Sequence, residues 1–233
     1  MRIIFVRHGE PDYARDCLTE EGRKQAAAAA ERLIRENISE IYASPCGRAS
    51  ETASYTASLL GLPVTILDYM HEISWGGFRI AHNGHPWTLG DLMLEEGFDF
   101  QKTDWRKHPY FDGNIASDYF KEISRQFDDF PAEHGYRHEN RRFLCETGTD
   151  KTIALFSHGG SGACVLSHLL NLPFPYVASV MPFDFTSIII LNFAVKEGAY
   201  IFPRLELFND SAHIRKSVEG PVLQQNCSFK VCQ

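Results

Sequence analysis

Arg2-Ile3-Ile4-Phe5-Val6-Arg7-His8-Gly9-Glu10 is the stretch that decides the fold of this 233-residue chain. The apolar, β-rich run over residues 2–6 is typical of a strand buried on both faces of a sheet. We expect Arg7, His8 and Gly9 at the carboxyl end of that strand, the edge at which α/β proteins bind ligands. There an arginine binds phosphate oxygens, a histidine supplies a nucleophile or carries a proton, and a glycine lets the backbone approach a ligand.

The segments that follow alternate between helix and strand patterns. Thr19 is a candidate N-cap for an alanine-rich helix that continues to about residue 35, with two glutamates in its first turn. The next expected elements are a strand over residues 38–43, a helix over about 48–60 and a strand over 64–67. A β-α-β-α-β order requires parallel strands joined by right-handed crossovers.

Regular patterns return in the last third of the chain. Residues 152–157 predict an apolar strand and residues 161–170 a helix. Two further strands, over 186–194 and 200–207, are expected to form a hairpin. We therefore predict an α/β fold, a three-layer α/β/α sandwich whose mostly parallel sheet has an antiparallel edge.

The middle of the chain, from about residue 76 to 145, has a different character. It is rich in aromatic and histidine residues, and a helix is indicated only around residues 118–130. We interpret it as a lid-like insertion that covers the active site, within a single domain spanning residues 1–233 that ends in a polar tail from about residue 210. The aromatic side chains either line a substrate pocket or fill the core of the insertion.

Composition argues against several classes of function. The 23 basic and 30 acidic residues give a net charge of −7, which disfavours bulk electrostatic binding to nucleic acid or to an anionic membrane. No apolar run approaches the ~20 residues that span a bilayer, and the start of the chain lacks the apolar segment of a signal peptide. We therefore expect a cytoplasmic protein. The six cysteines form no CxxC pair and match no zinc framework.

Three of the expected strand ends carry residues that suit a phosphate group. The first has Arg7 and His8, the second has Ser44-Pro45-Cys46-Gly47-Arg48, and the later one has Ser157-His158-Gly159-Gly160. Neighbouring parallel strands would bring these ends together. Two arginines, two histidines and two helix N-termini would then surround a tetrahedral dianion.

These residues resemble the histidine phosphatase superfamily, also called the phosphoglycerate mutase-like family. The resemblance rests on blocks that occur in the family's order: Arg7-His8-Gly9-Glu10, Leu18-Thr19-Glu20-Glu21-Gly22 with Gln25-Ala26, Ser44-Pro45-Cys46-Gly47-Arg48-Ala49-Ser50-Glu51-Thr52-Ala53, and His158-Gly159-Gly160. It covers most of the first 70 residues and about 150–195, and no block matches the middle segment.

The resemblance implies a cofactor-independent phosphatase that acts through phosphohistidine. His8 would be the nucleophile, while Arg7, Arg48, His158 and Gly159 would surround the phosphoryl oxygens. His8 must attack as a neutral imidazole, with its other ring nitrogen held by a backbone carbonyl. His158 is expected to be a charged donor, so the two histidine pKa values should lie far apart.

A carboxylic acid must also protonate the leaving oxygen. The family supplies it after the third strand, where this chain has His71-Glu72-Ile73-Ser74-Trp75-Gly76-Gly77. Glu72 is therefore the candidate, and Asp68 and Glu10 compete with it. Partial burial would keep Glu72 protonated near neutral pH.

Further side chains are candidates for binding the rest of a small phosphorylated substrate: Glu10, Cys17, Arg79 and Trp87. Glu51 is interpreted as a structural partner of an arginine. No cluster has metal-ligand spacing, and neither metal nor cofactor is expected, because arginines and histidines neutralise the phosphate.

Alternative functions stay open. One is phosphoryl transfer of the phosphoglycerate mutase type, and another is a non-catalytic phospho-ligand or protein-binding module on the same fold. Mutases of this family resemble one another in a Ser-x-Trp-Asn stretch just after the first motif, where this chain has Pro11-Asp12-Tyr13-Ala14. That departure favours a hydrolase and leaves the substrate open. An exposed edge strand or the aromatic insertion would be compatible with a homodimer.

Overall fold

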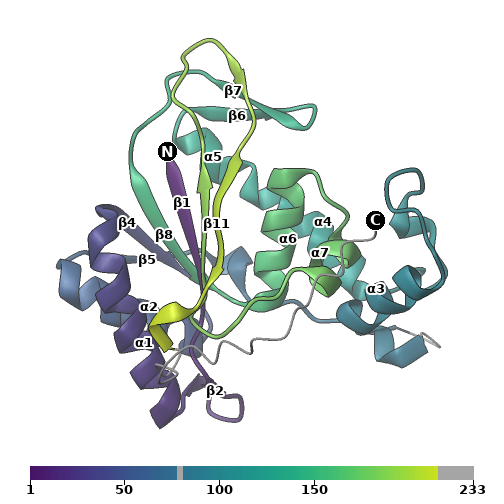
Figure 1. Ribbon diagram of the computed structural model, residues 1–233, viewed down its shortest axis with the longest axis horizontal. Coiled ribbons are helices and arrows are strands. Elements are labelled where there is room, and N and C mark those ends of the chain that lie inside the picture. Colours follow the sequence, from purple (N-terminus) through teal and green to yellow (C-terminus); the bar gives the residue numbers. More distant parts are fainter. Residues whose placement is uncertain (78–80, 215–233) are drawn as a thin grey trace, which may run out of the picture.

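A six-stranded sheet forms the centre of the computed structural model, which describes residues 1–77 and 81–214 (Figure 1). In sheet order its strands are β11 (Arg204–Asp210), β9 (Ile188–Asn192), β1 (Arg2–Arg7), β8 (Thr152–Ser157), β4 (Ile38–Ala43) and β5 (Val64–Ile66). Strands β1, β8, β4 and β5 run parallel, and β9 is antiparallel to both β1 and β11. The predicted α/β fold with a mostly parallel sheet is confirmed.

Helices cover both faces of this sheet because its central strands are apolar on both sides. Ile4 and Val6 of β1 belong to a core that includes residues of α1 (Glu20–Leu33) and α2 (Gly47–Leu60). Ile3 and Phe5 point the other way, into a larger core shared with α4 (Ile115–Phe127), α6 (Gly159–Leu170) and α7 (Phe174–Val180). Figure 1 shows these two groups of helices on opposite sides of the sheet.

The predicted hairpin between the strands over 186–194 and 200–207 is wrong in one detail. Tyr200 and Ile201 form a separate strand, β10, which pairs with β7 (Arg142–Cys145) in a second sheet instead of with β9. The edge strand β11 begins only at Arg204. Pro203, which has no N–H to donate to a ladder, lies between the two strands and marks the switch of the chain from one sheet to the other.

The middle segment is more regular than the sequence indicates. Its described elements are α3 (Pro86–Glu95), α4, α5 (Asp129–Glu133), β6 (Tyr136–Glu139), β7 (Arg142–Cys145) and the short 3₁₀ turns η3 (Ala81–Gly84) and η4 (Trp105–Lys107). Helix α3 packs against α7 and α4 against α6. Trp105, only 6% exposed, contacts Phe111, Phe120 and Phe174, so this aromatic group fills a core.

Short elements complete the described chain: β2 (Pro11–Asp12), β3 (Cys17–Leu18), η1 (Ile34–Glu36), η2 (Asp68–Met70) and η5 (Ala212–Ile214). The expected polar tail begins inside β11, and the rest of it, from residue 215, lies outside the described residues. The four cysteines at positions 17, 46, 145 and 164 are free thiols. Within the described chain, no helix has the length and apolar character needed to cross a membrane.

Candidate active site

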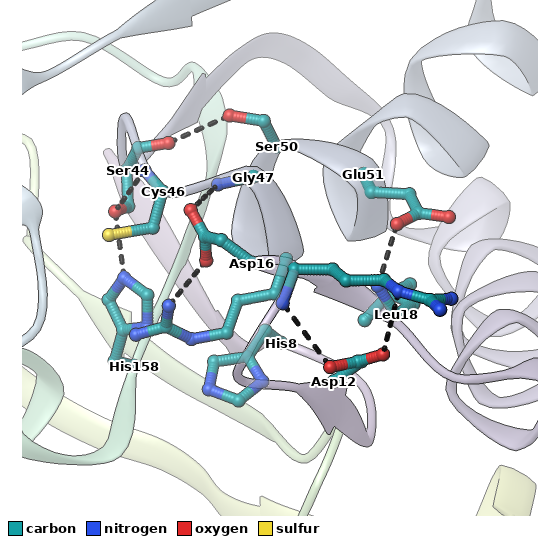
Figure 2. A network of polar contacts seen from close by, with 12 residues as sticks. His8, Asp12, Asp16, Leu18, Ser44, Cys46, Gly47, Ser50, Glu51 and His158 are labelled. Atoms are coloured by element: carbon teal, nitrogen blue, oxygen red, sulfur yellow. Dashed lines mark hydrogen bonds and ion pairs between the residues drawn. The ribbon is translucent and has the colours of Figure 1, made fainter.

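Three neighbouring strands end together and place the two histidines side by side. The order β1–β8–β4 puts His8 beside Ser157, whose carbonyl accepts from the His8 amide at 2.9 Å. His158 follows β8 as the N-cap of α6, and Ser44 follows β4 on the other side. The ring centroids of His8 and His158 lie 5.1 Å apart, and both side chains are buried. Figure 2 shows the His158 ring linked to Ser44, with the His8 ring close to it.

His8 is held as a neutral imidazole. Its Nδ1 lies 2.7 Å from the Gly9 carbonyl oxygen, which fixes Nδ1 as the protonated nitrogen and leaves a lone pair on Nε2. Burial lowers the pKa of His8 to about 3; the Gly9 carbonyl opposes this shift, and the charges of Arg7 and Arg48 add to it. His8 is therefore uncharged at neutral pH.

Gly9 is required by a close backbone approach. A Cβ atom at this position would lie 2.6 Å from the carbonyl oxygen of Gly22, near the start of α1. The amide of Gly9 donates to Thr52 Oγ1 on α2 at 3.1 Å. The turn after β1, and with it the imidazole of His8, is thus fixed against two helices.

His158 is neutral as well, contrary to the expectation of a charged donor. Burial lowers its pKa to about 2, and the charges of Arg48, His8 and Arg7 contribute in the same direction. The sequence-based expectation that the two histidine pKa values lie far apart is wrong for this arrangement, because both rings share one buried, cationic surrounding.

A hydrogen-bond chain orients the His158 ring. The Cys46 amide donates to Ser44 Oγ at 3.2 Å, and Ser44 Oγ lies 2.7 Å from His158 Nε2. A hydroxyl that already accepts from an amide satisfies all groups if it donates to Nε2. This assignment places the ring proton of the neutral imidazole on Nδ1, and Figure 2 shows the chain from Cys46 through Ser44 to His158.

The two arginines are anchored from opposite sides. Arg48, in the first turn of α2, donates to Asp16 Oδ1 at 2.5 Å, and Asp16 Oδ2 accepts from the Gly47 amide at 2.7 Å. Arg7 donates to the carbonyl oxygen of Phe183. Its guanidinium carbon lies 4.3 Å from the ring centroid of Phe185, a cation–π contact that helps to hold it in place.

Three buried nitrogens of this cluster lack a hydrogen-bond partner within the described chain: Arg7 Nε, Arg48 Nε and His158 Nδ1. Buried donors left unpaired are costly, by about 1–3 kcal/mol each, and native structures rarely tolerate them without a function. All three carry a proton in the assignment given above. They come from three different strand ends and match the donor set that a phosphoryl group requires.

Glu72 lies at the N-terminus of α6, beside Gly160 and Ser161. Its Oε1 accepts from the amides of Ile73, at 3.0 Å, and Ser161, at 3.1 Å. Burial raises the pKa of Glu72, and the backbone hydrogen bonds oppose the shift. The carboxyl group is thus poised to hold a proton closer to neutral pH than an ordinary glutamate, as a general acid requires.

Carboxylates occupy the helix N-termini that the sequence assigned to phosphate. Asp16 accepts a hydrogen bond from the Gly47 amide of α2, and Glu72 accepts one from the Ser161 amide of α6. Helix N-termini favour any anion, and here side chains of the protein supply it. Gly159 still borders the site, because a Cβ built on it would lie 3.7 Å from Arg7 Nε.

The remaining predicted residues are placed elsewhere or not described. Glu10 Oε1 accepts from the hydroxyl of Thr19, the N-cap of α1, so its carboxylate belongs to a helix start. Cys17 lies on β3 and Trp87 on α3, where the Trp87 ring contacts Trp75 and His85. Arg79 lies outside the described residues. Glu51 pairs with Arg23 at 2.7 Å, as a structural partner would.

Sequence reasoning gave no role of their own to three residues that shape this site: Ser44, Tyr13 and Phe185. Tyr13 is exposed, and its ring centroid lies 5.5 Å from the Arg48 guanidinium carbon. For Ser44 a signal was available, since it stands directly after a strand and before Pro45. Tyr13 and Phe185 carry no such local signal.

Comparison with known sequences identifies the class of protein. The model of the histidine phosphatase superfamily (branch 1) matches residues 3–202. The chain belongs to this superfamily. The sequence-based identification of the family, and with it of a phosphatase of the histidine phosphatase type, is confirmed at this level.

Two curated relatives show the range of names within the match. The chain is 25% identical to the glucosyl-3-phosphoglycerate phosphatase of Mycolicibacterium vanbaalenii over 74% of its own length and 75% of the relative. It is 26% identical to a protein of Cronobacter sakazakii named probable phosphoglycerate mutase, over 74% of this chain and 76% of that one. The relatives thus include both a hydrolase and a mutase by name.

A solved structure shares the fold. The phosphoserine phosphatase of Entamoeba histolytica, crystallised with 3-phosphoglyceric acid, superimposes with a TM-score of 0.62 at 23% identity. The match covers 92% of this chain and 99% of the other. It supports the three-layer architecture described above.

Proposed function

We propose that the protein hydrolyses small phosphomonoesters through a phosphohistidine at His8, without a cofactor. The observation that carries this proposal is the set of three unpaired, buried donors on Arg7, Arg48 and His158. They surround a neutral imidazole whose free lone pair is on Nε2. A phosphoryl group bound by these donors would present its phosphorus to His8.

In the first step, His8 Nε2 attacks phosphorus in line with the ester oxygen. The N–P bond forms as the P–O bond to the leaving group breaks, and Glu72 transfers its proton to the leaving oxygen. The amide bonds to Glu72 end on Oε1, so the proton belongs on Oε2. The arginines stabilise the charge on the phosphoryl oxygens.

In the second step, water attacks the phosphohistidine. The Glu72 carboxylate accepts a proton from this water, the N–P bond breaks, and inorganic phosphate leaves with His8 restored as a neutral imidazole. His158 donates to the phosphoryl group through Nδ1–H in both steps, with its Nε2 held by the Ser44 hydroxyl.

We also propose that residues 76–145 shape the substrate pocket, and that the substrate is a small phosphorylated metabolite. The segment begins a few residues after Glu72 and is tied to α4 there: the Ile115 amide donates to the Gly76 carbonyl at 3.0 Å. Several relatives act on phosphorylated acids by name, among them glucosyl-3-phosphoglycerate. The Pro11–Ala14 stretch, which departs from the mutase pattern, supports hydrolysis over phosphoryl transfer to a second hydroxyl.

The test uses His8→Asn, which keeps an N–H donor for the Gly9 carbonyl and removes the nucleophile. Wild-type protein should release p-nitrophenol from p-nitrophenyl phosphate in the presence of EDTA, and the variant should lose more than about 1,000-fold in kcat, equivalent to about 4 kcal/mol of transition-state stabilisation. Acid-labile label from a radioactive phosphoester should appear on wild type and be absent from the variant.

Cys46→Ser serves as the matched control, because Cys46 is the other nucleophile beside the site. It should keep its label and most of its activity. Label that persists in His8→Asn and vanishes in Cys46→Ser would contradict the mechanism. Incubation with 3-phosphoglycerate separates the alternatives, since a hydrolase releases inorganic phosphate and a mutase yields an isomeric phosphoglycerate.

A further inference from the structure

A second cluster of polar side chains lies away from the histidine pair, at the opposite end of α6. It contains Asp128, between α4 and α5, His138 on β6 and His168 in the last turn of α6. Asp128 Oδ1 lies 2.9 Å from His138 Nδ1 and 2.6 Å from His168 Nε2. The possible ligand atoms of the three residues all lie within 4.8 Å of one another.

We propose that Asp128, His138 and His168 bind a divalent transition-metal ion of the zinc type. Two imidazole nitrogens and one carboxylate oxygen are a donor set that suits such ions and not magnesium or calcium. Around tetrahedral zinc, donor atoms lie about 3.4 Å apart. The two measured separations would therefore widen by about 0.5–0.8 Å when the ion replaces the shared protons.

A cavity beside the two histidines would leave a fourth coordination position open to water. His138 and His168 line a cavity of about 760 Å³ between the middle segment and the C-terminal end of α6. The side chains of the three ligands are 19%, 14% and 36% exposed for His138, His168 and Asp128, so water can reach them. Zinc sites with three protein ligands keep such an open position for water.

The simplest alternative is a carboxylate that only bridges two neutral imidazoles by hydrogen bonds. That arrangement does not explain why three separate elements converge on one point. Lys102, Arg106 and Arg141 line the same cavity and oppose a free cation. Arg106, however, is already paired with Asp104 at 2.8 Å, and an ion bound through inner-sphere ligands gains far more than this repulsion costs.

The site would tie the middle segment to the helix that begins at the phosphate pocket. Its ligands come from α4–α5, from β6 and from α6, whose first residue is Gly159. A bound ion stabilises the folded state by mass action, so free zinc at 100 times its dissociation constant lowers the unfolding equilibrium constant about 100-fold. The inference does not rest on the proposed phosphatase mechanism.

The experiment titrates the full-length protein with Co²⁺, which reports tetrahedral coordination by its visible absorption, and then displaces it with Zn²⁺. We expect one equivalent in wild type, and affinity at least about tenfold weaker in His138→Gln, His168→Gln and Asp128→Asn. His134→Gln is the matched control, because His134 also contacts a carboxylate, that of Glu40 at 3.1 Å. It should bind as wild type does.

A second control separates this site from the histidine pair. His8→Asn should bind Co²⁺ with unchanged affinity and spectrum, whether or not it has lost phosphatase activity. The proposal is overturned if no saturable binding occurs up to millimolar Co²⁺ or Zn²⁺, or if His138→Gln and Asp128→Asn, folded by circular dichroism, bind as tightly as wild type. Loss of binding in His8→Asn would also overturn it, by moving the ion to the phosphate pocket.

Discussion

At the scale of single residues, the two histidines of the pocket are alike in charge and both carry the proton on Nδ1, but they differ in which ring nitrogen is left without a partner in the described chain. The Gly9 carbonyl places the proton of His8 on Nδ1, and the Ser44 hydroxyl places that of His158 on Nδ1 by occupying Nε2. His8 therefore presents a lone pair on Nε2 and His158 presents a donor. In the proposed mechanism, hydrogen bonds of neighbouring groups, rather than opposite charges, divide the roles of nucleophile and donor.

Replacing Glu72 by glutamine should lower kcat for an alkyl phosphomonoester such as 3-phosphoglycerate, whose alkoxide leaving group needs a proton, by about 10²–10⁴-fold. Glutamine retains an oxygen for the Ile73 and Ser161 amides and cannot transfer a proton. Because burial raises the pKa of Glu72, the wild-type rate should fall as pH rises above that pKa, and this limb should vanish in the variant. Steady-state kinetics across pH provide the measurement.

Asp68→Asn is the control for that substitution. Asp68 lies on the exposed start of η2, a few residues from Glu72, and competes with it as the acid on sequence grounds alone. Its variant should keep wild-type kcat and pH profile. A large loss of kcat in Asp68→Asn, together with an active Glu72→Gln, would show that our mechanism names the wrong residue as the acid.

At the scale of elements, the turn after β1 and the first turn of α1 are packed backbone against backbone. A Cβ at Gly22 would lie 2.1 Å from the Glu10 carbonyl oxygen. Gly22→Ala should therefore destabilise the protein by about 1–3 kcal/mol, although alanine is the better helix former by about 1 kcal/mol. The shift in thermal unfolding temperature gives the sign of this change in stability. As the control, Lys24→Ala on the exposed face of α1 should change the unfolding temperature little. A stabilised Gly22→Ala would contradict the packing.

Local sequence patterns predict much at this scale because the strand ends are short and self-contained. The apolar runs that end at Arg7, Ser44 and Ser157 define three strands and, through parallel pairing, bring their ends together. The diversion of residues 200–201 to the second sheet is a tertiary effect that no local pattern contains. The same holds for Asp16, whose hydrogen bonds to α2 depend on how the β2–β3 loop folds back.

At the scale of the whole molecule, the buried histidines make stability depend on pH. The pKa values of about 3 for His8 and about 2 for His158 lie below the value of 6.5 for an unfolded histidine. At pH values between the folded and unfolded pKa, the unfolded chain binds more protons than the folded protein. The free energy of unfolding therefore falls as pH drops from about 6.5 towards about 3. Each histidine contributes a slope of up to about 1.4 kcal/mol per pH unit.

Urea unfolding of wild type and His8→Asn at several pH values between neutral and mildly acidic tests this prediction. Glu72, whose pKa is raised, contributes with the opposite sign in both proteins, so the comparison isolates His8. The slope of unfolding free energy against pH should be smaller in the variant by about 1.4 kcal/mol per pH unit below pH 6. Equal slopes would show that His8 is not buried as a neutral group.

The cluster of Asp128, His138 and His168 marks the limit of sequence reasoning at this scale. The three residues are far apart in the chain and belong to three elements, so no motif spacing predicts the cluster. The proton positions of the pocket are hidden for a similar reason. They follow from one cationic, buried surrounding that forms only after β1, β4 and β8 have paired.

The connection between β5 and β8 has a consequence for how such an enzyme can diversify. Arg7, His8, Arg48 and His158 are all supplied by three adjoining strands and the turns that leave them. The residues from 67 to 151 form a single excursion between two strands of that sheet. Apart from Glu72 and its immediate neighbours, mutation can therefore rebuild much of this excursion under selection for a new metabolite, while the four residues at the strand ends are kept.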